Sequence, residues 1–484
     1  MLVYGLTFEY GGMNMNNNKV PNATDPQSSF SSLPLSEALL NNLGLLGYVT
    51  MTPIQAKSLP CLLKGEDVIA KAKTGSGKTA AFGLTLLQRL NVENFTVQAL
   101  VLCPTRELAE QVSQALRRLA RLMPNVKILN LSGGSPIRPQ FDSLRHGAHI
   151  IVGTPGRVQK HLKKATLTLN TLNIVVLDEA DRMLDMGFVD DIKAILSVCP
   201  KRRQTLLFSA TYPEEIKKIS KQFMHQAKEI LIETVHSQHD IEQHFYAATH
   251  TSKKFALLKT LLLHFKPTST LIFCNTKQQT TELAQMLNEA GFTALALNGD
   301  MEQVDRDLAM VRFTNHSCSI LVATDVAARG LDIKELPAVI NYELAFEHDV
   351  HIHRIGRTGR AGHQGLALSL TTPGDEERLE AIKANLAHPL VWGKTEELTK
   401  EAPIFKPDMV TLCIDAGRKD KIRPGDILGA LTKEAGLPGD AIGKIDITAL
   451  RSYVAVNHKQ ADAAYRSLQN GSLKGRKVNV SKLR

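Results

Sequence analysis

The sequence of 484 residues predicts an α/β protein with two consecutive parallel-sheet domains, followed by a small α+β domain. The first observation is a series of short apolar runs without polar alternation, separated by helical patterns, which is typical of parallel sheets covered on both faces. The second is that the same order restarts after His236. The third is a βαββαβ order from residue 408 onward, which favours a four-stranded sheet backed by two helices.

The expected domains follow from these runs. Residues 1–29, with an Asn-rich middle, are expected to be a disordered tail, and Met1, Met13 or Met15 could be the start of translation. The first sheet domain (30–235) has expected strands at 68–70, 97–102, 126–131, 149–152, 174–177, 205–208 and 229–232. The second (236–388) has them at 244–248, 270–273, 294–297, 319–322, 339–342 and 366–370. We interpret 389–407 as a linker in which Trp392 packs against a neighbouring domain. The last domain (408–484) has expected strands at 409–414, 442–447, 453–456 and 477–480, and helices at 427–435 and 460–468.

Positive charge is concentrated near the C-terminal end. From Phe405 to Arg484 there are 15 Lys/Arg against 8 Asp/Glu, which places +7 of the chain's +10 there. Such an excess favours a polyanionic partner; an ordinary solvated surface is the alternative. The six cysteines form no Cys-x-x-Cys pair, which supports neither a disulfide framework nor a zinc site. Without an apolar run of about 18 residues or a signal peptide, we expect a cytoplasmic protein with no membrane partner.

A glycine-rich turn lies between an apolar run and a helical pattern at residues 72–79 (AKTGSGKT). The backbone N–H groups of such a turn, at the positive end of a helix dipole, form a phosphate cradle. Lys78 is placed to reach the β- and γ-phosphates, and Thr79 to hold Mg²⁺. Ala72 stands where the strict pattern has Gly, which costs little if the backbone there is not left-handed. The turn predicts a nucleoside triphosphate site; the alternative is a flexible Gly/Ser loop.

Acidic and hydroxyl side chains follow two later runs. Asp178, Glu179 and Asp181 come directly after the run 174–177. Asp178 could hold Mg²⁺ through water, and Glu179 could deprotonate the attacking water. Ser209 and Thr211 follow the run 205–208, and their hydroxyls could link the acidic strand end to the other domain. Helix capping is the alternative interpretation of the adjacent acids.

Arginines alternate with glycines at residues 353–360 (HRIGRTGR) of the second domain. An arginine that reaches the γ-phosphate stabilises phosphoryl-transfer charge and is worth roughly 10³–10⁵ in rate. An Arg-rich surface loop is the alternative. If these arginines lie across a cleft between the domains, hydrolysis depends on domain closure.

From Phe30 to Leu386 this set of motifs resembles that of the DEAD-box RNA helicases, whose two tandem domains are RecA-like. Residues 47–55 are similar to the family's adenine-recognising Q motif, with Phe30 at 17 residues upstream and Met51 where many members have Pro. The resemblance implies catalytic roles for Lys78, Asp178, Glu179, Arg357 and Arg360. It implies Mg²⁺ at Thr79 and Asp178, largely through water. It further implies ATP contacts at Phe30, Tyr48, Gln55, Thr74, Gly75, Ser76, Gly77, Lys78, Thr79 and Asp332, and interdomain coupling through Asp181, Ser209, Thr211 and His353.

The resemblance also implies an RNA-binding surface that reads the phosphate backbone and not the bases. In the first domain, this implied surface consists of strand ends and helix starts that present N–H, hydroxyl and guanidinium groups. The matching residues are Pro104, Thr105, Arg106, Gly133, Gly134, Thr154, Gly156 and Arg157 in the first domain, and Thr324, Arg329 and Gly330 in the second.

Residues 423–431 (RPGDILGAL) and 442–445 (IGKI) resemble the DbpA group of bacterial DEAD-box proteins. That group's RNA-binding domain tethers the helicase core to large-subunit ribosomal RNA during assembly; a generic βαββαβ module is the alternative. RNA-recognition sheets normally stack bases on aromatic rings of the first and third strands. Here the first strand has none, and the third has only Tyr453. We therefore predict that basic side chains bind a folded hairpin, with Tyr453 secondary: Lys444, Arg451, Arg476 and Lys477.

The sequence thus predicts a monomeric ATP-dependent RNA helicase that remodels ribosomal RNA during large-subunit assembly. Its expected partners are a ribosomal RNA hairpin and ribosomal assembly intermediates, and its expected cofactors are ATP and Mg²⁺. One alternative is an ATP-gated RNA clamp that separates no strands. Another is an RNA-binding module with an inactive ATPase core, which the presence of Lys78, Glu179, Arg357 and Arg360 disfavours. A DNA helicase is disfavoured by the RNA-type C-terminal segment.

Overall fold

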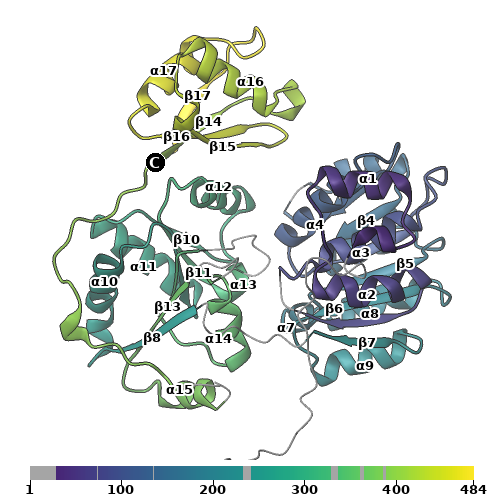
Figure 1. Cartoon of the computed structure of the whole chain (residues 1–484), viewed down its shortest axis with the longest axis horizontal. Coiled ribbons are helices and arrows are strands. Elements are labelled where there is room, and N and C mark those ends of the chain that lie inside the picture. The colour runs from purple at the N-terminus through teal and green to yellow at the C-terminus, as the bar shows by residue number, and fades with distance from the viewer. Residues whose placement is uncertain are drawn as a thin grey trace, which may run out of the picture. The chain divides into compact units, whose positions relative to one another are not determined.

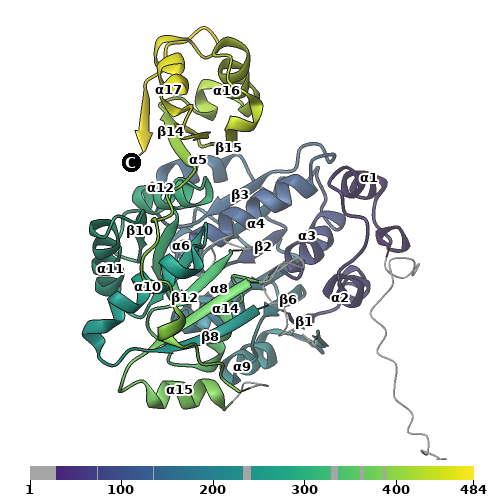
Figure 2. The same cartoon turned by 60° about the vertical axis from the view of Figure 1, so that its left-hand side comes forward.

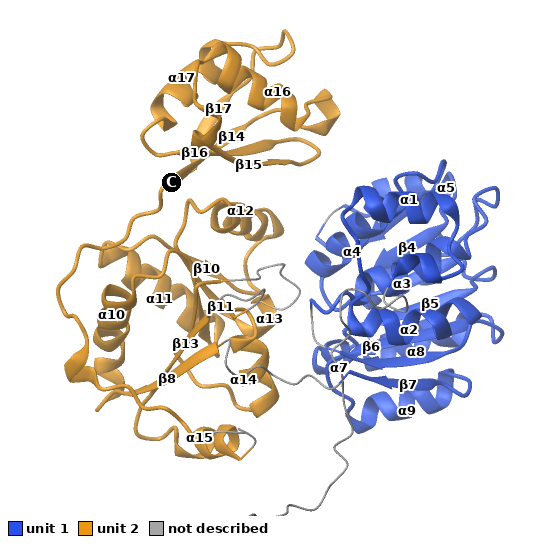
Figure 3. Cartoon of the chain, viewed as in Figure 1, with its two compact units in different colours: residues 1–234 blue, residues 235–484 orange. Residues whose placement is uncertain are grey.

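The computed structural model describes residues 29–72, 75–134, 136–232, 241–328, 336–359, 365–384 and 389–483. The chain forms two compact units, residues 1–234 and 235–484 (Figure 3). The predicted tail lies almost wholly outside the described residues. So do five of the predicted site residues: Thr74, Arg329, Gly330, Asp332 and Arg360.

The first unit contains a parallel sheet of seven strands in the order β3-β4-β2-β5-β6-β1-β7. Its strands are buried on both faces because their side chains alternate between two cores. Val68 and Ala70 point into one core and Ile69 into the other. Helices α1 to α4 pack in the first core, and α6 to α9 in the second. The strands are β1 (Val68–Lys71), β2 (Ala99–Leu102), β3 (Ile128–Leu131), β4 (Ile150–Gly153), β5 (Ile174–Asp178), β6 (Gln204–Ser209) and β7 (Lys228–Leu231). The helices are α1 (Glu37–Leu45), α2 (Pro53–Lys64), α3 (Lys78–Gln88), α4 (Arg106–Leu119), α5 (Arg138–Arg145), α6 (Pro155–Lys163), α7 (Ala180–Asp185), α8 (Val189–Val198) and α9 (Glu214–Phe223).

The second unit begins with a parallel sheet of six strands in the order β10-β11-β9-β12-β13-β8. Helices α10 and α11 cover one face, while α12 and α13 cover the other (Figures 1 and 2). Across the described residues, no helix is both long and apolar enough to cross a bilayer. The strands are β8 (Ile241–Ala247), β9 (Thr270–Cys274), β10 (Ala294–Leu297), β11 (Ile320–Thr324), β12 (Ala338–Asn341) and β13 (Gly365–Thr371). The helices are α10 (Lys254–Phe265), α11 (Lys277–Glu289), α12 (Gln303–Thr314), α13 (Asp325–Ala328), α14 (His348–Ile355) and α15 (Glu376–Lys383).

The segment after α15 lies along this second sheet. The N–H of Phe245 donates to the carbonyl of Val391 over 2.9 Å, and the N–H of Gly393 donates back to Phe245 over 2.9 Å. The Trp392 ring packs against the Phe245 ring at a centroid distance of 6.0 Å, in line with the prediction for this tryptophan. Leu398, further along, is buried in the core that α10 and α11 form with this sheet.

A four-stranded antiparallel sheet, in the order β15-β16-β14-β17, follows in the same unit. Two helices back it on one face (Figure 1). The βαββαβ prediction is confirmed, but the last strand begins at Val480 and not at Lys477. The reason is a tight turn: Leu473 and Arg476 pair across Lys474 and Gly475, whose φ values are 52° and 73°. The elements are β14 (Met409–Ile414), α16 (Pro424–Gly429), a π-helical turn (Ala430–Glu434), β15 (Ile442–Ile447), β16 (Ser452–Asn457), α17 (Ala461–Asn470) and β17 (Val480–Leu483).

Candidate ATP and RNA sites

The glycine-rich turn lies between the carboxyl end of β1 and the first residue of α3. Gly75 and Gly77 have φ values of 84° and 95°, a region that glycine adopts without strain. Ala72 is not among the residues with positive φ, so its methyl group is tolerated, as the sequence led us to expect. Lys78 is buried, and its Nζ donates to the Ala72 carbonyl over 2.9 Å. The lysine side chain therefore crosses the turn and is held at its centre.

Gln55 fixes the start of α2 and touches the same turn. Its Oε1 accepts from the N–H of Thr52 over 2.8 Å, and its Nε2 donates to the carbonyl of Gly77 over 3.1 Å. A Cβ at Gly77 would come within 2.5 Å of Gln55 Nε2, so this close approach also requires glycine. Within the described residues, these bonds leave a second N–H and a second lone pair of the amide available. Nearby, Phe30 packs edge-on against Tyr48 at 6.2 Å between ring centroids.

Asp178 is the last residue of β5 and is buried. Burial raises its pKa to about 7, against the opposing effect of the Lys78 charge. Its Oδ1 has no hydrogen-bond partner among the described residues. A buried carboxylate oxygen of this kind fits a hard cation such as Mg²⁺, which prefers oxygen ligands and retains several waters. Thr79, the other predicted Mg²⁺ residue, is half-buried in the first turn of α3.

Glu179 adopts a left-handed backbone conformation, with φ 51° and ψ 53°, at the N-cap of α7. A residue other than glycine pays roughly 1–3 kcal/mol for such a conformation, and such strain clusters at functional sites. Arg182 NH1 lies 3.1 Å from Glu179 Oε2, and both side chains are almost fully buried. Arg182 was not predicted from the sequence; its position three residues after Glu179, one helical turn away, was the available signal.

Asp181 forms hydrogen bonds with the hydroxyl residues at the carboxyl end of the neighbouring strand β6. Its Oδ2 accepts from the N–H of Ala210 over 3.1 Å and from the N–H and hydroxyl of Thr211 over 2.8 and 2.9 Å. Its own N–H donates to Ser209 Oγ over 3.2 Å. Burial opposes ionisation of Asp181, but the hydrogen bonds from Thr211 and Ser209 hold its pKa below the usual value. The structure thus brings the three predicted coupling residues of the first domain into one network.

The predicted RNA residues of the first domain lie at three neighbouring strand ends. Arg106 begins α4, and its guanidinium lies over Gly133, where a Cβ would be 3.0 Å from Arg106 Nε. Burial and the Arg106 charge lower the pKa of Arg157. Arg157 NH1 donates to Gln140 Oε1 over 3.0 Å, and His161 Nε2 lies 2.9 Å from the same oxygen. The other predicted RNA residues sit at these strand ends or the helix starts that follow them: Pro104, Thr105, Gly134, Thr154 and Gly156.

In the second unit, Arg354 of α14 is the largest fully buried side chain among the described residues. Its Nε and NH2 donate to the two carboxylate oxygens of Asp325, each over 2.7 Å. NH2 also donates to Asn275 Oδ1 over 2.7 Å, and NH1 to the Glu343 carbonyl over 2.6 Å. The sequence analysis did not name Arg354 as a site residue, although it lies inside the 353–360 motif. Through these hydrogen bonds the Arg354 side chain joins the ends of β9, β11 and β12.

The other described residues that were predicted for the second domain lie on α14, just after it, or at the end of β11. His353 is on α14, next to Arg354. Arg357 follows the helix and is buried, and its carbonyl accepts from the N–H of Leu336 over 3.1 Å. Thr324 ends β11, and its Oγ1 accepts from the N–H of Ala327 over 3.4 Å.

Three of the four basic residues predicted to bind a hairpin have carboxylate partners. Lys444 Nζ lies 2.8 Å from Asp446 Oδ2, and Arg451 Nε lies 3.5 Å from Asp415 Oδ1. Arg476 pairs with Asp420. Lys477 is exposed, and no ion pair of Lys477 is recorded within the described part of the chain. These pairs lie at the surface, where an ion pair contributes little to stability and exchanges readily for a phosphate contact.

The sheet face opposite α16 and α17 is covered. Thr411 and Cys413 of β14 pair with Ala455 and Tyr453 of β16, and all four side chains are buried. Thr411 Oγ1 lies 2.6 Å from the hydroxyl of Ser317, which belongs to the loop after α12. Bases therefore cannot stack on this face without displacing that loop.

The fold and site define a class: a nucleoside triphosphatase with two RecA-like sheets and an attached RNA-recognition module. Comparison with known families agrees. The DEAD/DEAH box helicase model matches residues 52–219, the helicase conserved C-terminal domain 253–362, and the DbpA RNA binding domain 411–482. The chain belongs to the DEAD-box ATP-dependent RNA helicases, and within them to the DbpA type.

The chain is similar to curated proteins over nearly its whole length. It is 52% identical to the ATP-dependent RNA helicase DbpA of Escherichia coli, covering 94% of this chain and 100% of that protein. It is 36% identical to the DbpA of Bacillus subtilis, with coverage of 94% and 99%. Among solved structures, Saccharomyces cerevisiae Dbp5 bound to RNA and ADP BeF3 matches with a TM-score of 0.69 and 31% identity, covering 76% of this chain and 96% of that one.

Proposed function

We propose that this helicase uses ATP and Mg²⁺ to open short structured elements of ribosomal RNA, and that its C-terminal domain directs it to them during large-subunit assembly. The observation that carries the proposal is the joining of two parts in one chain. One is a core in which Asp178 and Glu179 follow a strand near the Lys78 turn. The other is a DbpA-type RNA-binding domain with exposed basic side chains.

The proposed hydrolysis uses the residues of the turn and of the acidic strand end. Lys78 and the N–H groups of residues 75–79 bind the β- and γ-phosphates, and Gln55 selects adenine. The oxygen of the attacking water forms a bond to the γ-phosphorus, and the bond between that phosphorus and the β–γ bridging oxygen breaks. Glu179 accepts the proton that the water loses. Mg²⁺ would be held by Asp178 and Thr79, mostly through water, and would neutralise phosphate charge.

RNA would control this chemistry from both domains. Arg106 and Arg157, whose positive charges lie close together, are proposed to bind RNA phosphates. Arg357 and Arg360 are proposed to reach the γ-phosphate when ATP and RNA draw the two domains together. Closure on one strand displaces its partner, and hydrolysis then releases the RNA.

The C-terminal domain would direct the helicase to its RNA target through positively charged side chains. The sheet face opposite α16 and α17 is covered by the loop after α12. The proposed hairpin contacts are therefore the exposed cations Lys444, Arg451, Arg476 and Lys477. Contacts of this type bind phosphates and the shape of a folded RNA more than unstacked bases.

The test is RNA-stimulated phosphate release with fragments of total ribosomal RNA, compared with unstructured RNA of matched length. We expect a structured large-subunit fragment to stimulate at lower concentration, and a duplex attached to it to be separated. Equal stimulation by all RNAs would contradict the ribosomal target. Stimulation without strand separation would instead identify an ATP-gated clamp.

A further inference from the structure

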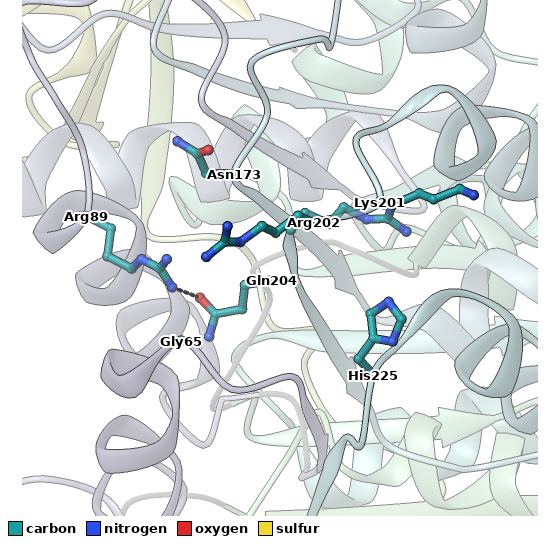
Figure 4. Close-up of a pocket in the computed structure, with 8 residues that line it drawn as sticks. Gly65, Arg89, Asn173, Lys201, Arg202, Gln204 and His225 are labelled. Atoms are coloured by element: carbon teal, nitrogen blue, oxygen red, sulfur yellow. Dashed lines mark hydrogen bonds between the residues drawn. The ribbon is translucent and has the colours of Figure 1, made fainter.

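A basic pocket of about 590 Å³ opens at the amino ends of β1, β5 and β6 in the first unit (Figure 4). The candidate ATP and RNA residues of this unit lie at the carboxyl ends of the same sheet. A strand such as β6 spans about 20 Å, at roughly 3.3 Å per residue, so the two edges are separate surfaces. Eight residues line the pocket: Gly65, Arg89, Asn173, Lys201, Arg202, Arg203, Gln204 and His225.

Among the described residues, the lining has no acid and no large apolar side chain. The two acids that follow Gly65 in the chain already have partners. Asp67 accepts from the N–H of Thr205 over 2.8 Å and from the N–H of His225 over 2.7 Å, and Glu66 pairs with Lys228 at 2.8 Å. No ion pair is recorded for Lys201 or Arg202 in the described ranges of the chain. The positive charge of the pocket is therefore not neutralised locally.

Two of the arginines are held in place before any ligand arrives. Arg89 NH1 donates to Gln204 Oε1 over 2.8 Å, while Gln204 Nε2 is anchored to the carbonyls of Leu62 and Glu66 over 2.9 and 2.7 Å. Gly65 has φ 86°, and a Cβ there would be 2.8 Å from Arg89 NH1, so the glycine makes room for this arginine.

Arg203 is held from the other side. Its NH1 donates to the carbonyl of Pro200 over 2.8 Å, and its NH2 to that of Phe223 over 3.3 Å. These bonds tie the loop before β6 to the end of α9. Arg203 Nε is buried and has no hydrogen-bond partner among the described residues. Lys201 and Arg202 extend from this fixed loop and are exposed.

We propose that this pocket binds backbone phosphates of the RNA that extends beyond the part held by the helicase core. Guanidinium and ammonium groups with amide neighbours match phosphate oxygens, and the described lining contains no Phe, Tyr or Trp on which a base could stack. Sequence-independent contact is what such a lining provides. RNA is the polyanion that this helicase handles, and the inference does not depend on whether that RNA is ribosomal.

The experiment uses the full chain and two single-stranded RNAs, one short enough for the core alone and one longer. The test variant is Lys201→Glu/Arg202→Glu. The matched control is Lys163→Glu/Lys164→Glu, which makes the same charge change on exposed residues at the end of α6. Affinity is measured across a salt series, and RNA-stimulated ATPase at saturating short RNA is measured in parallel.

We expect the test variant to bind the long RNA about tenfold more weakly. The slope of log K against log [salt] should be shallower by about 0.7 for each phosphate that the variant no longer neutralises. Its affinity for the short RNA and its ATPase rate stay at the parent level, and the control variant behaves as the parent with both RNAs. The charge-keeping variant Lys201→Arg/Arg202→Lys binds the long RNA as the parent does.

Three results would overturn the inference. Equal losses of affinity in the test and control variants would show a general charge effect. Unchanged affinity for the long RNA, with inorganic phosphate still binding in the pocket, would identify a site for free anions. Unchanged RNA affinity combined with loss of polyglutamate binding would assign the pocket to an acidic protein segment.

Discussion

Thr211 donates both its backbone N–H and its hydroxyl to one oxygen of Asp181, over 2.8 and 2.9 Å. The acid follows β5 and the hydroxyl follows β6, so the two bonds lock neighbouring strand ends together. The contact makes the position of the acidic strand end depend on Thr211. This dependence is what the proposed coupling between hydrolysis and RNA remodelling requires.

Thr211→Val keeps the side-chain volume and the N–H bond but removes the hydroxyl donor. We expect a loss of about 1.5–3 kcal/mol in the free energy of unfolding, because the hydrogen bond is made to a buried charge. Strand displacement should fall more than ATP hydrolysis. The measurement is the number of duplexes separated per ATP hydrolysed. Thr205→Val, on the preceding strand β6, is the control; equal changes in both variants would argue against coupling through Thr211.

Glu179→Gln removes the proposed base and leaves a side chain of the same shape. We expect RNA-stimulated phosphate release to fall by about 10²–10⁴, which is the usual contribution of a general base. RNA binding with a non-hydrolysable ATP analogue should be retained. Because the substitution also removes the charge partner of Arg182, the thermal midpoint is measured alongside. A near-parental ATPase rate would contradict the assignment of Glu179.

Arg354→Ala removes the fork that binds both oxygens of Asp325. We expect a loss of about 3–5 kcal/mol in denaturant unfolding of the full chain, because buried partners are left unpaired. Arg354→Lys should fall between this variant and the parent, since lysine keeps the charge but lacks the fork. Arg378→Lys is a control at a half-exposed arginine, and a loss as large as that of Arg354→Lys would be unexpected.

The burial of His351 predicts that the free energy of unfolding depends on pH in the acid range. Its ring is buried between α14 and β8, stacked on Phe245, and burial lowers its pKa from 6.5 to about 3, with the charges of Arg354 and His348 acting in the same direction. The unfolded chain therefore binds a proton that the folded chain excludes as pH falls from about 6.5 towards 3. The free energy of unfolding should decrease over that window.

The variant that checks this is His351→Leu, which removes the titrating group and keeps an apolar filling. Its thermal midpoint should fall less between pH 7 and acid than that of the parent. The exposed residue His146 provides the control His146→Leu, for which we expect the parental acid dependence. Identical acid dependence in all three proteins would show that His351 does not titrate as stated.

The C-terminal domain should bind its hairpin through charge. We expect Lys477→Glu to weaken hairpin binding and to reduce the salt slope by about 1, the change that follows when one phosphate is no longer neutralised. Tyr453→Ala should weaken binding less, because the Tyr453 ring is buried. Lys459→Glu, an exposed charge reversal after β16, is the control. If Tyr453→Ala abolished binding while Lys477→Glu had no effect, base stacking would be the binding mode.

Local patterns predicted most elements well. The run 174–177 became β5, and the glycine-rich turn joined β1 to α3, because strand burial and glycine geometry are encoded within a few residues. The last strand was misplaced by three residues because the pairing of Leu473 with Arg476 sets where the chain turns. Arg182 and Arg354 were missed for a related reason: a buried arginine looks like a surface arginine until its partners are placed.

The sequence by itself determined the set of motifs, the parallel sheets and the RNA-type C-terminal domain, because these depend on local residue types and periodicity. Only the tertiary structure decided how the motifs group. Along the chain, the phosphate turn after β1 comes first, then the RNA motifs after β2, β3 and β4, then the acids after β5. In the sheet, crossovers place β1 beside β6, so the ATP residues gather at β5-β6-β1 and the RNA residues at β3-β4-β2. Strand order is set by non-local packing, which no short stretch of sequence encodes. The same packing leaves the opposite edge of the sheet with the basic pocket around Arg89 and Arg203.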